Sequence, residues 1–223
     1  EKFKNITRKI HTEKDELVIG YHGNYPHLFK FFPFLQQAIE EISLQTSIRL
    51  KIITGDSNFK WQIGKPNIEN IDIYNYKDID VSKVIKTFDV GVVPNVTDLR
   101  VFQEFSPIAQ TKNLDIGINT TDYFLRFKNK TNPGRAYVLY QHGIPVIHDL
   151  SPSSFALMHA AGIYSCAHSK ESWIKEIKRM TCHKTRELFS KKYFELFNSI
   201  FSNEKRVKDL IVNISSLICK NNI

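Results

Sequence analysis

The chain has 223 residues, and its 42% hydrophobic and 24% charged content excludes a disordered or low-complexity protein. Lys and Arg number 31 against 23 Asp and Glu, and the net charge of +8 favours anionic partners such as phosphates, acidic lipids or nucleic acid. Cys166, Cys182 and Cys219 have neither the pairing of a disulfide framework nor the spacing of a zinc site, so we expect no metal.

Short β-branched runs alternate with helical periodicities from Glu16 onward, which is typical of an α/β domain with a mostly parallel sheet. The predicted strands are Leu17–Tyr21, Ile48–Thr54, Asn70–Tyr74, Val90–Val93, Pro145–His148 and an edge strand at Gly162–Ser165. The carboxyl ends of parallel strands form the ligand crevice of an open sheet. The loops that follow these strands are therefore the first places to look for a site.

Helical periodicity separates these strands and dominates the last part of the chain. The predicted helices cover residues 33–42, a two-turn stretch from Val81 to Phe88, a short piece at Tyr123–Phe127, and Asn132 to Gln141. In the last of them, Asn132 suits the N-cap and Pro133 the first helical position. Beyond Ser169 three apolar stripes are expected: Trp173, Ile174, Ile177 and Met180; Leu188, Phe189, Phe194, Phe197, Ile200 and Phe201; and Val207 to Ile218.

We divide the chain into an N-terminal extension of residues 1–15, an α/β domain of residues 16–180 and C-terminal helices of residues 181–223. No apolar run approaches the roughly 20 residues that span a bilayer. The first residues have neither a Met nor an apolar run, so we expect a cytoplasmic chain, whole or a piece of a longer one.

The most informative window runs from Tyr123 to His148 and contains no Asp or Glu. Basic side chains, with Lys128, Lys130 and Arg135 among them, lie just before and within the first turn of a predicted helix. The unpaired N–H groups and positive dipole end of a helix start favour an anion. The window therefore predicts a phosphate or diphosphate site, and a solvated basic loop is the alternative.

The same window resembles a known family. Residues 132–147, which read Asn-Pro-Gly-Arg-Ala-Tyr-Val-Leu-Tyr-Gln-His-Gly-Ile-Pro-Val-Ile, are similar to the helix and strand of the nucleotide-sugar-binding half of GT-B glycosyltransferases. Residues 84–95 resemble the helix, apolar strand and Pro-Ser of that family, and residues 71–78 the strand and turn before them. The resemblance implies a Rossmann-like sheet of about six strands flanked by helices, with a C-terminal helical extension, that binds a nucleoside diphosphate sugar without a cofactor or a bound metal.

On this resemblance, Arg135 matches the basic position that contacts the donor diphosphate. The full set of expected donor-binding residues is Gly23, Asn24, Asn95, Lys128, Lys130, Asn132, Gly134 and Arg135. Gly23 and Asn24 belong to it because a glycine permits close backbone approach and an amide hydrogen-bonds a sugar or phosphate, although an ordinary strand-to-helix turn explains them equally.

The chain also departs from the family pattern. The usual pair of glutamates falls at Lys130 and Val138, and the valine removes the two acceptor oxygens that bind the donor ribose in that family. The Gly-Arg…Lys-Gly sequence that many relatives have after the first strand is replaced by Gly20–Tyr25. No residue is therefore assigned as catalytic.

Two histidines have simpler interpretations. His142, near the C-terminal end of the predicted helix, is expected to stabilise that end as a cation. His148 ends a strand beside Asp149 at the edge of the expected crevice, where contact with the donor or the acceptor is a hypothesis.

The first hypothesis is the donor domain of a glycosyltransferase, acting on a glycan or lipid-linked acceptor bound by a separate N-terminal half. The competing hypothesis is a non-catalytic module that binds an anionic membrane surface or polyanion through Lys170–Lys192, where eight basic and three acidic residues give 8 − 3 = +5. Both are compatible, because such a domain can lie peripherally at the inner membrane face. Nucleic acid is not expected, since the basic segment has no recognisable motif and no interleaved aromatic residues.

Overall fold

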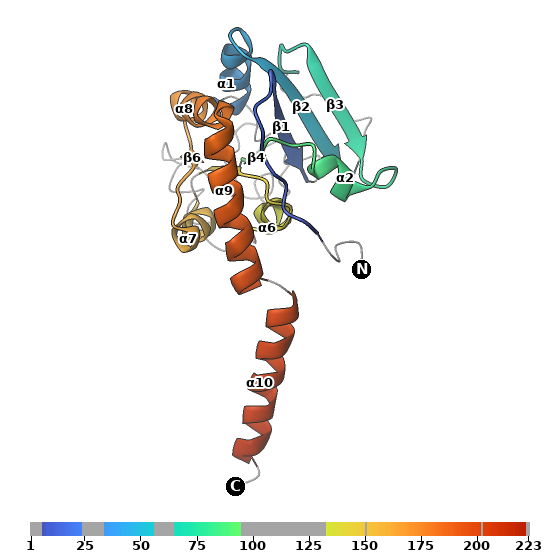
Figure 1. The fold of residues 1–223 in the computed structure, drawn as a ribbon, viewed down its shortest axis with the longest axis vertical. Helices are drawn as coiled ribbons and strands as arrows, with labels where there is room; N and C mark the ends of the chain where they lie inside the picture. Colours follow the sequence, from blue (N-terminus) through green and yellow to red (C-terminus); the bar gives the residue numbers. More distant parts are fainter. Residues whose placement is uncertain are drawn as a thin grey trace, which may run out of the picture.

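The computed structural model describes residues 6–23, 34–55, 65–94, 133–149, 151–201 and 203–221. Its centre is a six-stranded parallel sheet with the order β3-β2-β1-β4-β5-β6 (Figure 1). The strands are β1 (Glu16–His22), β2 (Ser47–Thr54), β3 (Asn70–Asn75), β4 (Val90–Val93), β5 (Val146–Asp149) and β6 (Cys166–Ala167). The predicted α/β, Rossmann-like class with about six mostly parallel strands is confirmed.

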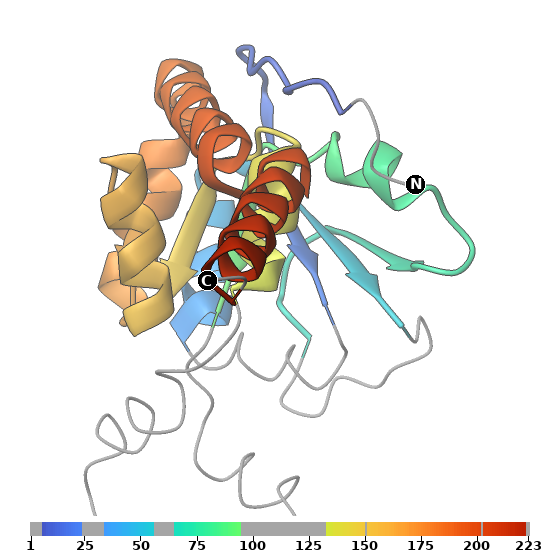
Figure 2. The same ribbon diagram turned by 90° about the horizontal axis from the view of Figure 1, so that it is seen from below.

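Helices flank this sheet and extend from it at the C-terminus. They are α1 (Phe34–Ser43), α2 (Val81–Ile85), α6 (Gly134–Gln141), α7 (Pro152–Ala161), α8 (Lys170–Thr181), α9 (His183–Leu196), a π-helical turn (Phe197–Phe201) and α10 (Asn203–Asn221). α1 packs beside α8, whereas α9 packs against α6, α7 and α8 (Figures 1 and 2). α10 projects away from the sheet (Figure 1).

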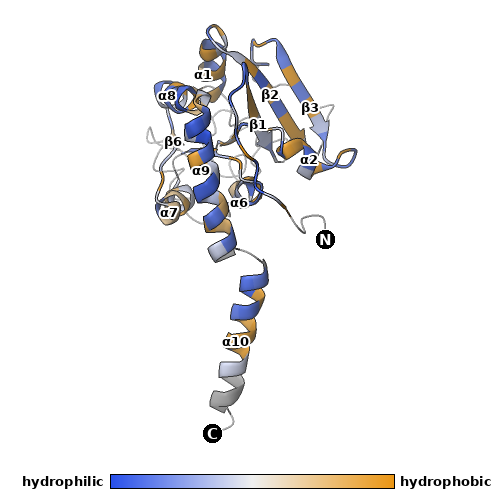
Figure 3. Ribbon diagram, viewed as in Figure 1, coloured by the Kyte–Doolittle hydropathy of each residue, from blue (hydrophilic) through white to orange (hydrophobic). Residues whose placement is uncertain are grey.

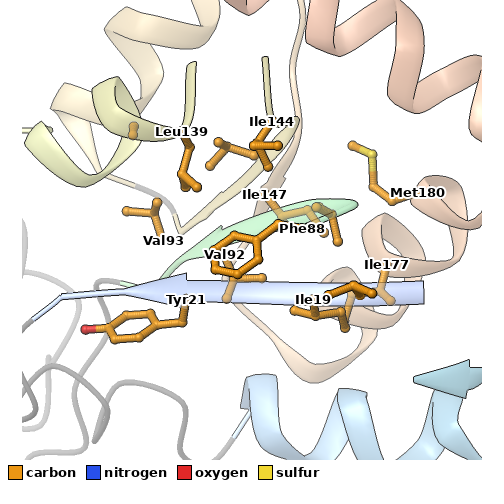
Figure 4. Close-up of a cluster of buried hydrophobic side chains, with 14 of the residues drawn as sticks. Ile19, Tyr21, Phe88, Val92, Val93, Leu139, Ile144, Ile147, Ile177 and Met180 are labelled. Carbon is orange, nitrogen blue, oxygen red and sulfur yellow. The ribbon is translucent and has the colours of Figure 1, made fainter. Parts of the chain in front are cut away.

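The core forms where the buried strands meet α6 and α8. Figure 4 shows Ile19 of β1, Val92 of β4, Leu139 of α6 and Ile177 of α8 in one apolar cluster, and each is at most 1% exposed. A strand covered on both faces reads as a continuous apolar run, which is why Leu17–Tyr21 is buried throughout. This packing fixes the strand ends that carry the candidate site.

The region after β5 differs from the prediction. The edge strand expected at Gly162–Ser165 is wrong: Gly162 ends α7 in a left-handed conformation, and β6 follows it. α7, which the periodicity did not reveal, begins at Ser151, whose hydroxyl accepts a hydrogen bond from the Ser154 N–H.

Two helix predictions need small corrections, and a third concerns residues that the structure does not describe. α6 begins at Gly134 with Pro133 as its N-cap, so Pro133 does not occupy the first helical position and Asn132 is not the N-cap. α2 ends at Ile85, and Phe88 lies beyond it in the core. The helix expected at Tyr123–Phe127 lies outside the described residues.

The apolar stripes of the C-terminal helices are only partly as expected. Trp173, Ile177 and Met180 form the buried side of α8, as predicted. On α9 the predicted stripe is right at Phe189, which is 1% exposed, and wrong at Leu188, which is 52% exposed. The buried residues of α9 are Arg186, Phe189, Ser190, Tyr193 and Leu196. This face includes polar residues because it meets the N-terminal segment as well as the core.

Residues 8–14, which we call the N-terminal strap, run alongside α9 before the chain enters β1 (Figure 1). Arg186 donates to the Thr12 carbonyl at 2.7 Å, and Arg8 pairs with Glu187 at 2.6 Å. The strap therefore ties α9 to the amino edge of the sheet. The division at residues 1–15, 16–180 and 181–223 stays a prediction.

Candidate functional site

The expected donor-binding residues fall into two groups. Gly23, Gly134 and Arg135 are described, and all three lie at the carboxyl edge of the sheet or at the start of α6. The others lie outside the described residues: Asn24, Asn95, Lys128, Lys130 and Asn132. The structure brings Gly23 and Arg135 together, since a methyl group added to Gly23 would lie 3.1 Å from the Arg135 Cδ.

Arg135, the second residue of α6, joins the helix start to two strand ends. Its guanidinium carbon lies 5.8 Å from the centroid of the Tyr21 ring, a cation–π arrangement, and one guanidinium nitrogen donates to the Pro94 carbonyl at 3.4 Å. Its own backbone carbonyl accepts a hydrogen bond from His22 Nε2 at 2.8 Å. The arginine therefore faces the carboxyl ends of β1 and β4, as the diphosphate hypothesis requires.

The two neighbours of Arg135 on β1 are neutral at pH 7. Burial raises the pKa of the Tyr21 hydroxyl to about 12, although the nearby Arg135 charge and hydrogen bond oppose this. Burial also lowers the pKa of His22 to about 4, and the Arg135 and His142 charges act in the same direction. Neither side chain cancels the positive charge of Arg135.

The start of α6 adds backbone donors to this charge. The first N–H groups of an α-helix have no acceptor within the helix, and a side chain usually caps them. The N-cap of α6 is Pro133, which makes no side-chain cap hydrogen bond. An anion that lay against Gly134 and Arg135 would meet both a helix N-terminus and a guanidinium, which is the common arrangement for phosphate.

His148 and Asp149 lie at the end of β5, and both are buried. His148 Nε2 is 2.6 Å from the Tyr140 hydroxyl, and the Tyr140 ring stacks on Tyr193 with centroids 4.0 Å apart. Burial lowers the pKa of His148 to about 3, with the Arg135 charge acting in the same direction. His148 is therefore a neutral member of a buried aromatic cluster, and its contact with donor or acceptor stays a hypothesis.

The prediction for His142 is wrong. Its Nδ1 donates to the Val138 carbonyl at 2.8 Å and its Nε2 accepts from the Ser82 hydroxyl at 2.9 Å. Burial lowers the pKa of this imidazole, so it is neutral at pH 7 and joins α6 to α2 by hydrogen bonds. It does not serve as a cation at the helix end.

Sequence reasoning missed Tyr21 and His22 as neighbours of the arginine. The available signal was their position, because polar or aromatic residues that directly precede a glycine at a strand end lie at the ligand edge of a parallel sheet. Among the described residues, no cluster of three or more His, Cys, Asp or Glu is placed to hold a metal ion. No helix in the described ranges combines the length and the apolarity that crossing a bilayer requires.

No protein-family model matches this sequence, and no curated protein is significantly similar to it. A search of solved structures finds a mutant of the O-GlcNAc transferase of Thermobaculum terrenum, with a TM-score of 0.57 and 11% sequence identity. The fold is glycosyltransferase-like. The match covers 99% of this chain but only 40% of the transferase chain. At this identity the likeness concerns the fold alone.

Proposed function

We propose that this chain is the donor-binding domain of a GT-B glycosyltransferase and binds a nucleoside diphosphate sugar at the carboxyl edge of its sheet. The observation that carries the proposal is Arg135, held on the first turn of α6 against the ends of β1 and β4. The glycosyltransferase-like fold supports it. The expected donor-binding residues Asn24, Asn95, Lys128, Lys130 and Asn132 lie outside the described residues and stay predictions.

In the proposed reaction, the bond between the anomeric carbon and the diphosphate oxygen breaks, and a hydroxyl oxygen of the acceptor takes its place. The departing diphosphate gains negative charge, which Arg135 and the N-terminus of α6 stabilise because they are already in place. The proton of the acceptor hydroxyl passes to a base. We assign that base, and the site for a glycan or lipid-linked acceptor, to a part of the enzyme outside this domain.

The test begins with a thermal-shift panel of UDP-, GDP-, ADP-, CMP- and TDP-linked sugars, because a ligand that binds only the native state raises the melting temperature. Calorimetry then compares wild type with Arg135→Ala and Arg135→Lys. We expect the alanine variant to lose about 10- to 100-fold in affinity, as for a charged hydrogen-bond donor. The affinity of the lysine variant should lie between those of wild type and the alanine variant, because lysine keeps the positive charge but lacks the planar guanidinium with its paired donors.

Lys83→Ala is the matched control, because Lys83 is a cation whose side chain is 85% exposed on α2. Its affinity and melting temperature should equal those of wild type. The proposed function would be overturned if no nucleotide sugar raised the melting temperature of the wild-type protein. It would also be overturned if Arg135→Ala bound the donor as tightly as wild type.

The second candidate function is attachment to the inner face of an anionic membrane, and one observation favours it. Val207, Leu210, Ile211 and Ile214 of α10 follow the i, i+3, i+4, i+7 spacing of one helix face and are 48–59% exposed (Figure 3). Exposed Lys and Arg residues at positions 205, 206 and 208 precede or alternate with them. An amphipathic helix of this kind lies in the headgroup region of a bilayer.

α10 is therefore a better membrane contact than the predicted segment Lys170–Lys192, which buries its apolar side against the sheet. Co-sedimentation with vesicles of phosphatidylcholine and phosphatidylglycerol tests this. The double substitution Leu210→Ser and Ile214→Ser should abolish binding, and Leu188→Ser, an equally exposed leucine on α9, should preserve it. If the wild type, the double variant and Leu188→Ser bind the vesicles equally, α10 is not the membrane contact.

A further inference from the structure

His22, at the carboxyl end of β1, has a hydrogen-bonding capacity that the diphosphate hypothesis does not use. Its Nε2 lies 2.8 Å from the backbone carbonyl oxygen of Arg135. A carbonyl oxygen only accepts hydrogen bonds, so the proton of this contact belongs to Nε2. The contact with α6 therefore fixes the tautomer of the ring.

The other ring nitrogen must then carry a lone pair. The His22 ring is neutral at pH 7, because burial lowers its pKa to about 4. A neutral imidazole has one N–H group, so an Nε2–H tautomer leaves Nδ1 as an acceptor. Among the residues that the structure describes, the ring has the Arg135 carbonyl as its hydrogen-bond partner and no second one. The residue is half-buried, and it stands at the edge where the donor is proposed to bind.

We infer that His22 Nδ1 accepts a hydrogen bond from a hydroxyl group of the bound nucleoside diphosphate sugar. This inference rests on the proposed function. Arg135 holds the diphosphate, and the two groups on either side of a diphosphate, the ribose and the sugar, both carry hydroxyls. His22 is joined to the same arginine, so its acceptor nitrogen lies next to one of those groups.

Val138, on the helix that carries Arg135, is half-buried against the apolar core. It has no polar side-chain atom, so it cannot accept from a hydroxyl. His22 supplies an acceptor from a different element, and a neutral one, which does not repel the diphosphate.

Glutamine at position 22 separates ligand contact from a purely structural role. Its amide nitrogen can replace Nε2–H and still donate to the Arg135 carbonyl, but it leaves no acceptor at the position of Nδ1. If His22 only positions α6, His22→Gln should bind the donor as wild type does. If Nδ1 receives a ligand hydroxyl, His22→Gln should keep the wild-type melting temperature and lose about 5- to 10-fold in affinity.

The experiment is calorimetry of wild type, His22→Gln and the control His168→Gln, whose imidazole is exposed on the surface. The ligands are the nucleoside diphosphate sugar found by the panel, the nucleoside diphosphate alone, and its 2′-deoxy form. A ribose contact predicts that removing the 2′-hydroxyl weakens binding to wild type and no further to His22→Gln. A sugar contact predicts that the loss in His22→Gln vanishes for the nucleoside diphosphate alone.

The outcomes separate this inference from the proposed function. Equal affinity of His22→Gln and wild type for every ligand refutes the hydroxyl contact and leaves the donor site intact, whereas no binding by wild type overturns both. Nitrogen-15 NMR of the free protein gives a readout that needs no ligand, and a ring protonated on Nδ1 would also refute the inference.

Discussion

Two polar clusters lie at opposite edges of the same sheet, and the charged side chains in them have different kinds of partner. At the amino edge, the buried carboxylate of Asp89 pairs with Lys9 at 2.9 Å and Lys14 at 3.0 Å and accepts the Val18 N–H at 3.0 Å. At the carboxyl edge, the Arg135 guanidinium lies over the Tyr21 ring and donates to the Pro94 carbonyl, and the backbone carbonyl of Arg135 accepts a hydrogen bond from His22. The first arrangement pairs a buried carboxylate with two lysines, and the second orients a guanidinium at a helix start beside two strand ends.

The difference separates a structural cluster from the proposed ligand site. A buried ion pair needs further hydrogen bonds to offset desolvation, and the amino edge provides them. Lys9 also donates to the Phe88 carbonyl, and Arg186 donates to the carbonyls of Met180 and Thr181 at 2.7 and 2.8 Å. All these partners belong to the protein itself. We propose that an anion binds at the other edge, where Arg135 lies at the start of α6.

Removing the carboxylate at the amino edge should have the largest effect on stability. Asp89 is 1% exposed, so Asp89→Asn would leave Lys9 and Lys14 around an uncharged amide. We expect the free energy of unfolding to fall by about 3–5 kcal/mol, as for one partner removed from a buried pair. Urea denaturation followed by circular dichroism measures it.

Asp15→Asn is the control, because Asp15 is an exposed aspartate that directly follows Lys14 in the sequence. It should change the free energy of unfolding by less than about 0.5 kcal/mol. Donor affinity of the folded Asp89→Asn protein should equal that of wild type. A small effect on stability, or a selective loss of donor binding, would contradict the division between the two edges.

Acid should lower the free energy of unfolding, because each edge of the sheet contains a buried histidine that is neutral in the native state. Burial lowers the pKa of His11 to about 4 and that of His148 to about 3, against an ordinary value of 6.5. Below pH 6.5 the unfolded chain therefore binds protons that the native state excludes, and stability falls as the pH drops toward 4. Each histidine should contribute about 2 kcal/mol between pH 7 and 5.

The measurement is the free energy of unfolding at pH 7 and pH 5 for wild type, His11→Gln and His148→Gln. Each variant should show a smaller difference between the two pH values than wild type does. A wild-type stability that does not change over this range would mean that these imidazoles are not held neutral. Asp89 adds a separate loss at lower pH: burial alone would raise its pKa, but the two lysines lower it below 3.8.

The sequence predicts the sheet well because its signal is local. A continuous apolar run marks the buried strand at Leu17–Tyr21, and apolar, mostly β-branched residues that begin by alternating with Arg49 and Lys51 mark the strand at Ile48–Thr54. β6 has two residues, too few for any pattern. α7 was missed because its sequence, Pro-Ser-Ser-Phe-Ala-Leu-Met-His-Ala-Ala, has apolar residues around the whole helix and so lacks a one-sided stripe.

The site was predictable only in part, for a similar reason. Gly23 and Arg135 stand at a strand end and a helix start, which chain order alone identifies. Tyr21 and His22 contact α6, more than 110 residues along the chain, so their position before a glycine indicates the ligand edge but does not reveal Arg135 as their neighbour. The prediction for His142 was wrong because burial, which a sequence does not state, decides whether an imidazole is charged.

The smallest predicted effects come from one glycine at each edge. Gly143 has φ of +69° at the amino edge, where an added methyl group would overlap the Arg8 side chain and lie 3.2 Å from the Lys9 nitrogen. Gly143→Ala should therefore lower the free energy of unfolding by about 1–2 kcal/mol from backbone strain, with a further loss where the strap is displaced. Donor affinity should not change.

Gly23 has φ of +150° at the carboxyl edge, and its added methyl group would lie 2.8 Å from the Tyr21 hydroxyl and 3.1 Å from the Arg135 Cδ. Gly23→Ala should lower stability by a similar 1–2 kcal/mol and, in addition, weaken donor binding by displacing Arg135. Gly162→Ala is the matched control, since φ there is +66° and an added methyl group meets nothing within 4 Å. Denaturation should show a lower free energy of unfolding in all three variants, and calorimetry should show weaker donor binding in Gly23→Ala alone. Weaker donor binding in Gly143→Ala as well would mean that the two edges are coupled through the sheet.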